Sequence, residues 1–117
     1  MKCWSDVICE NLSYEEACRY IKNYPGAAYI TRKGREAIYF YHSSKRSKLT
    51  YYSLKADGQI VKDPVVYCKY KNDWMIVTIS KAAAKTLHEH RIIKSAPAFN
   101  LRSRWDNKKE IQEIVEG

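Results

Sequence analysis

The sequence lacks the short motifs that mark most small enzymes and metal proteins. Only four of its 117 residues are glycine, and none stands in a P-loop or a G-x-G-x-x-G phosphate-binding turn. No G-x-S-x-G nucleophile elbow is present, and the four cysteines include no C-x2-C pair of the kind that binds zinc. The H-E-H triplet at 88–90 is predicted to be helical, and positions two apart on a helix do not face each other. We therefore expect no enzyme, no metal and no other cofactor.

Long apolar stretches are also missing. No run of 18 apolar residues occurs, so we expect no membrane span and no membrane partner. The first ten residues carry Trp4, Asp6 and Glu10 where a signal peptide would have its apolar core. The expected location is the cytoplasm, with reduced thiols. Cys18 and Cys68 lie in apolar patterns, which indicates buried thiols.

Positive charge and tyrosine are what the sequence has in excess. Lysine and arginine total 21 against 13 aspartates and glutamates, a formal net charge of +8, and ten tyrosines stand against two phenylalanines. A basic surplus of this size on a small chain favours an anionic partner over solubility alone. The candidate partners are a nucleotide, a nucleic acid and an acidic protein surface.

The hydrophobic pattern predicts an α+β fold, with an N-terminal helix packed on an antiparallel β-sheet and a helical C-terminal tail. A capping box from Ser13 to Glu16 begins a helix over 14–23, which Pro25 ends. Ser80 is placed to cap a second helix over 81–89.

A single domain is expected over 1–94, followed by an extension over 95–117 that contains a short helix. That helix has too little apolar surface to be stable alone. It docks on its own domain or on another subunit, and the sequence leaves both open.

Six strands are expected, separated by turns and loops, three of which contain glycine or proline. The strand at 74–79 is apolar almost throughout, which indicates a central, buried position. Residues 1–11 form either a short strand or an irregular lead-in. The six expected strands cover 27–32, 36–42, 49–55, 59–62, 65–70 and 74–79.

Cations and tyrosines gather around the hairpin at 27–41. Arginine offers a planar fork to phosphate oxygens. Tyr39 and Tyr41 are two apart and so share one face of the sheet, where a base can stack for about 1–3 kcal/mol. The alternative is that the tyrosines close the edge of the core and the cations are simply solvated. The candidate ligand-binding residues are Arg32, Lys33, Arg35, Tyr39, Tyr41, Arg46, Asp73 and Trp74.

Three segments, in this order, carry a family resemblance: LSYEEACRYIKNYPGAAYITRKG at 12–34, EAIYFY at 36–41 and NDWMIV at 72–77. Together they resemble the phage Thoeris anti-defence sponge proteins, which have an F-x-E-A-L type helix, a V-x-R-K-G strand and a D-W-E-I-V strand. The matching positions are Tyr14, Glu16, Ala17, Ile30, Arg32, Lys33, Gly34, Asp73, Trp74, Ile76 and Val77.

The resemblance implies a small α+β chain that forms a homo-oligomer and holds a cyclic-nucleotide-type immune signal between subunits without cleaving it. Such a protein would inhibit antiviral defence in the host cytoplasm. The family usually has tryptophan directly after the glycine of the basic strand, whereas this chain has Arg35. Arg35 is then expected to be this chain's own ligand contact.

Two alternatives remain open. The basic and aromatic surface of the sheet suits single-stranded nucleic acid. A basic protein of this size can also mask an acidic surface of a host defence protein, for which the helical tail at 81–116 is the best candidate element.

Overall fold

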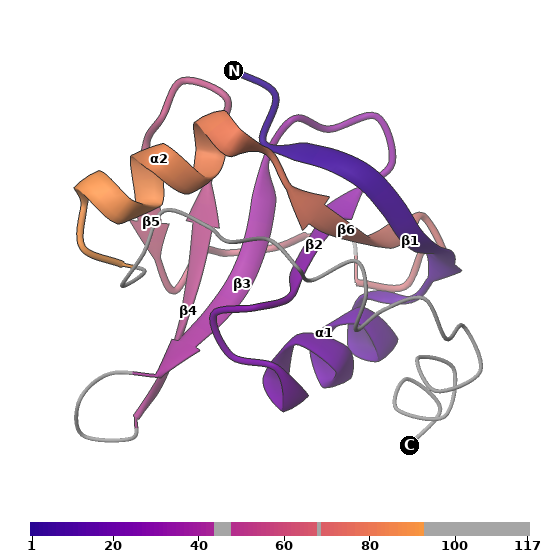
Figure 1. Ribbon diagram of the computed structural model, residues 1–117. Helices are drawn as coiled ribbons and strands as arrows, with labels where there is room; N and C mark the ends of the chain where they lie inside the picture. The colour runs from indigo at the N-terminus through magenta and orange to yellow at the C-terminus, as the bar shows by residue number, and fades with distance from the viewer. Residues whose placement is uncertain (44–47, 68, 93–117) are drawn as a thin grey trace.

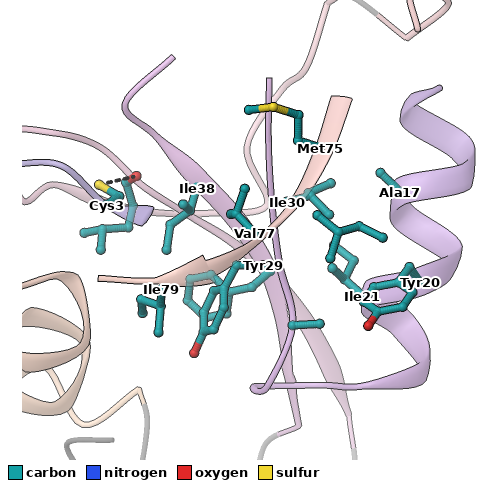
Figure 2. Close-up of a cluster of buried hydrophobic side chains, with 14 of the residues drawn as sticks. Cys3, Ala17, Tyr20, Ile21, Tyr29, Ile30, Ile38, Met75, Val77 and Ile79 are labelled. Atoms are coloured by element: carbon teal, nitrogen blue, oxygen red, sulfur yellow. Dashed lines mark hydrogen bonds between the residues drawn. The ribbon is translucent and has the colours of Figure 1, made fainter. Parts of the chain in front are cut away.

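The computed structural model describes residues 1–43, 48–67 and 69–92. Its six strands form one antiparallel sheet in the order β1-β6-β2-β3-β4-β5, with α1 and α2 on opposite faces (Figures 1 and 2). The predicted α+β fold, with the N-terminal helix packed on the sheet, is confirmed. The elements are β1 (Trp4–Leu12), α1 (Tyr14–Asn23), β2 (Tyr29–Arg32), β3 (Ile38–Ser43), β4 (Leu49–Leu54), β5 (Ile60–Lys62), β6 (Trp74–Ile79) and α2 (Lys81–Glu89).

Both helices begin at the caps that the sequence indicates. The hydroxyl of Ser13 accepts the amide of Glu16 at 3.1 Å, and the Glu16 carboxylate accepts the amide of Ser13 at 3.0 Å. This reciprocal capping box starts α1. The Ser80 hydroxyl accepts the amide of Ala83 at 3.1 Å and starts α2. The predicted spans of both helices are confirmed.

Strand β6 is central, as its apolar sequence predicts. It lies between β1 and β2, and all six of its residues are buried. Trp74 faces Leu12 on one side and Arg32 on the other. Of the two alternatives for residues 1–11, the strand is confirmed, because β1 pairs along β6 on the side away from β2.

The core fills both faces of the sheet. Figure 2 shows Tyr20 and Ile21 pointing from α1 toward Ile30, while Tyr29 and Ile79 lie on the opposite face, nearer α2. All five side chains are at least 96% buried. Since neighbouring residues of a strand point to opposite faces, β2 contributes to both halves of the core.

The expected strand at 65–70 is wrong. Residues 64–67 have no regular structure and belong to a crossover segment, 63–73, which carries the chain from edge strand β5 to central strand β6. The described part of this segment does not pair with β5, which stays the edge of the sheet. Val65 and Tyr67 are instead 72% and 87% exposed.

Three expected strands start later than predicted, of which β5 starts one residue later, at Ile60. Ala27 and Ala28 extend the turn after α1, because their amides bond to the carbonyl of Tyr24. Strand β3 begins at Ile38, since the residues before it belong to the turn that Lys33 and Gly34 open.

Some expectations fall outside the described residues. These are the extension at 95–117 with its helix, and the side chains of Arg46 and Cys68, so they stay predictions. Cys18 is buried, as expected. Within residues 1–43, 48–67 and 69–92, no helix is both long and apolar enough to cross a membrane.

Candidate functional site

A cleft of about 500 Å³ opens between three turns of the chain. We call it the hairpin cleft. Four of the predicted site residues line it, namely Arg32, Arg35, Tyr39 and Trp74. The remaining lining residues come from the β2–β3 turn, the β4–β5 turn and the crossover segment: Glu36, Ala37, Lys55, Ala56, Val65, Val66 and Tyr67.

Strand register brings the predicted residues together. Arg32 of β2 lies opposite Trp74 of β6, and Ile30 lies opposite Tyr39 of β3. Residues that face each other across antiparallel strands point to the same side of the sheet. Arg32, Trp74 and Tyr39 therefore share the face that α1 covers in part.

Arg32 is held in place by Asp73. Its Nε donates to Asp73 Oδ2 at 2.5 Å, and the two side chains are 23% and 26% exposed. The Asp73 carbonyl also accepts the amide of Lys33 at 2.8 Å, which ties the β2–β3 turn to the start of β6. Asp73 thus acts as the residue that orients Arg32 toward the cleft.

Arg35 and Lys55 supply the cleft's exposed cations. Neither forms an ion pair with another described residue. The Arg35 carbonyl accepts the indole N–H of Trp4 at 3.0 Å, so the backbone at this position is anchored while the guanidinium faces solvent. An exposed guanidinium above an anchored backbone is well placed to meet a ligand.

Tyr39 is the half-buried aromatic of the cleft. Burial raises the pKa of its phenol, and the charges of Arg35 and Arg32 oppose that rise. Both arginines line the same cleft as this phenol. The cleft combines an aromatic ring with converging positive charge.

Trp74 packs against the ring of Tyr39. Its side chain is 1% exposed and meets Tyr39 edge-on, with ring centroids 5.4 Å apart. A second edge contact joins it to Tyr14 at 5.1 Å. Tyr51 stacks on Tyr39 at 6.0 Å. Trp74 thus fixes Tyr39 and presents little of its own surface to a ligand.

The other predicted site residues lie elsewhere. Lys33 is exposed in the turn and does not line the cleft. Tyr41 lines a different cleft, beside α1. Arg46 lies outside the described residues. The structure thus gathers four of the eight predicted residues around one cavity, with Asp73 as a supporting fifth.

Lys55 and Tyr67 are lining residues that the sequence analysis did not single out. Lys55 follows β4, whose Leu54 pairs with Ile38 next to the β2–β3 turn. The D-G turn signal just after Lys55 would have placed it beside that turn. Tyr67 joins the cleft from the crossover segment, whose path local sequence does not reveal.

No group of three or more histidine, cysteine, aspartate or glutamate residues is placed to hold a metal ion among the described residues. Comparisons with protein-family models, curated proteins and solved structures find no match to this chain.

Proposed function

We propose that this protein binds an anionic, cyclic-nucleotide-type immune signal and sequesters it without cleaving it, which inhibits a host antiviral defence. The observation that carries the proposal is the composition of the hairpin cleft. Its lining includes three cations, Arg32, Arg35 and Lys55, together with the ring of Tyr39. A nucleotide needs both positive charge and a flat apolar surface, and this cleft offers both.

Each part of a nucleotide has a counterpart in the cleft. Arg35 and Lys55 meet the phosphate, and Arg32 adds a charge whose direction Asp73 fixes. The base lies against Tyr39, beside apolar surface from Val65. The cleft volume falls within the roughly 300–1,000 Å³ of small-molecule sites.

The lining favours binding over catalysis. Among the described lining residues, Glu36 is the one carboxylate, and no histidine, cysteine, serine or threonine is present. Hydrolysis of a phosphodiester needs a positioned base or a metal-activated water. Sequestration needs only affinity, for which charge-assisted hydrogen bonds contribute about 1.5–3 kcal/mol each before the costs of ordering the ligand.

The ligand is held in a homo-oligomer, with a second copy of this chain covering the open side of the hairpin cleft. The exposed Val65 and Tyr67 on the cleft wall support this arrangement, because large apolar side chains at a cavity rim gain stability when covered. The assembly would act in the cytoplasm.

Calorimetry tests the proposal. The folded protein is titrated with a panel of cyclic nucleotides and ADP-ribose derivatives, and at least one member is expected to bind with sub-micromolar affinity. The bound ligand is then recovered and checked for cleavage. The absence of heat with every member of the panel, or recovery of cleaved ligand, would overturn the proposal.

Single-stranded nucleic acid is a second candidate ligand, favoured by the crossover segment. Tyr67 and Tyr70 are 87% and 91% exposed, and the exposed Lys69 and Lys71 flank Tyr70. Unpaired bases stack on exposed aromatic side chains, and neighbouring cations bind the phosphate backbone. A steep loss of affinity for a long oligonucleotide with rising salt supports this function. Equal affinity for a mononucleotide and an oligonucleotide would argue against it.

A further inference from the structure

A second cleft, of about 460 Å³, lies between α1 and β3, and we call it the α1 cleft. Its lining includes Tyr14, Cys18, Arg19, Lys22 and Tyr41. We propose that the α1 cleft is a separate anion-binding site, which takes a small phosphate ester that carries an aromatic ring. This goes beyond the proposed function, because the two clefts share no lining residue.

Helical spacing builds one wall of the α1 cleft. Tyr14, Cys18 and Lys22 follow one another at intervals of four along α1, so they form a line along one side of the helix. Arg19 adds a second cation to that wall. Figure 1 shows α1 lying across the sheet below β2 and β3, and Tyr41 of β3 supplies the opposite wall.

Two cations, Arg19 and Lys22, line this cleft against one acidic residue, Glu15. Lys22 and Lys69 both act on the thiol of Cys18, where they oppose the rise in pKa that burial causes. Arg19 and Lys22 of the lining supply the charge that a phosphate needs, and the arginine adds a planar fork.

The aromatic part of the site is also prearranged. The Tyr14 and Tyr51 hydroxyls are hydrogen-bonded at 3.1 Å, and the Tyr41 ring contacts the Tyr51 ring at 4.9 Å. The ammonium of Lys22 lies 5.6 Å from the centre of the Tyr41 ring. Charge and ring are therefore side by side, as a phosphate ester with an aromatic group requires.

Adenosine monophosphate is a suitable probe, used with the isotope-labelled full chain in an NMR titration. The backbone amides of Cys18 and Lys22 report on the α1 cleft, and those of Arg35 and Tyr39 report on the hairpin cleft. The test variant is the double substitution Arg19→Ala/Lys22→Ala. The matched control is Lys81→Ala/Lys85→Ala, which removes the same charge from exposed positions of α2 on the opposite face of the sheet.

The Cys18 and Lys22 amides are expected to shift with saturation in the wild type and in the control. They should shift equally in Arg35→Ala/Lys55→Ala, which disables only the hairpin cleft. The Arg19→Ala/Lys22→Ala variant should bind at this site at least about tenfold more weakly. Amides of α1 that do not respond to the probe, or that respond alike in the test and control variants, would overturn the proposal. The Arg35 and Tyr39 amides report separately on the proposed function.

Discussion

Replacing Arg35 with alanine removes one cation from the hairpin cleft while leaving the fold intact. The side chain is exposed, and the bond from the Trp4 indole goes to the Arg35 backbone carbonyl, which alanine retains. Surface substitutions of this kind change the free energy of unfolding by about 0.5 kcal/mol or less. Any larger change in ligand affinity therefore reports on the lost guanidinium.

The size of the effect follows from one charge-assisted contact. Such a contact contributes about 1.5–3 kcal/mol, which corresponds to roughly 10- to 150-fold in the dissociation constant. Calorimetry with the tightest ligand of the nucleotide panel measures it. Arg35→Lys keeps the charge without the planar fork, so its loss should be intermediate. Lys85→Ala on α2 removes the same charge far from the cleft and should have no effect.

The same variant has a readout that needs no ligand. The charge of Arg35 opposes the rise that burial causes in the pKa of Tyr39. Arg35→Ala should therefore raise the pKa of Tyr39 further, which an NMR pH titration of labelled tyrosine detects. If Arg35→Ala binds a ligand of the wild type with unchanged affinity, Arg35 does not contact that ligand and the binding site lies outside the hairpin cleft.

Three further predictions concern stability. Asp73→Ala should lower the free energy of unfolding by about 1–3 kcal/mol, because it removes the carboxylate that pairs with the half-buried Arg32. Urea titrations measure this change, and equal stability of variant and wild type would contradict the orienting role of Asp73. Ser13→Ala should cost about 1 kcal/mol by removing the cap of α1, seen as a lower melting temperature, whereas an unaltered melting temperature would not fit. Burial raises the pKa of Cys3 from 9.0 to about 11, so the unfolded chain loses this proton first. The contribution of Cys3 to stability should be constant below pH 9 and be lost toward pH 11, so urea titrations should show a shallower alkaline loss of stability in Cys3→Ala than in the wild type, and parallel losses would contradict this.

The sequence was most informative where local chemistry decides the structure. The caps at Ser13 and Ser80 fix where each helix starts, because a side-chain oxygen meets a backbone amide three residues on. The continuous apolar run at 74–79 requires burial on both faces, which only a central strand provides. These features need no knowledge of distant residues.

Local chemistry does not predict the irregular structure of the crossover segment or the lining residues of the hairpin cleft that come from it and from the β4–β5 turn. The weak alternation at 65–70 resembles an edge strand, and whether it forms one depends on whether it pairs with an edge of the folded sheet, which local sequence does not show. Lys55 and Tyr67 join the cleft through strand pairing and chain crossing, so their positions depend on the whole sheet. Tyr39 and Tyr41 share a face, as expected, yet neighbouring elements divide that face into two clefts.

The binding of a nucleotide-type anion in the hairpin cleft can be tested by mass spectrometry of the small molecules that the denatured protein releases after purification from cells that make candidate signals. We expect an intact nucleotide-type anion from the wild type and much less of it from Arg35→Ala/Lys55→Ala purified in parallel. Release of no such molecule, or of equal amounts from both proteins, would contradict the assignment of the hairpin cleft as the binding site.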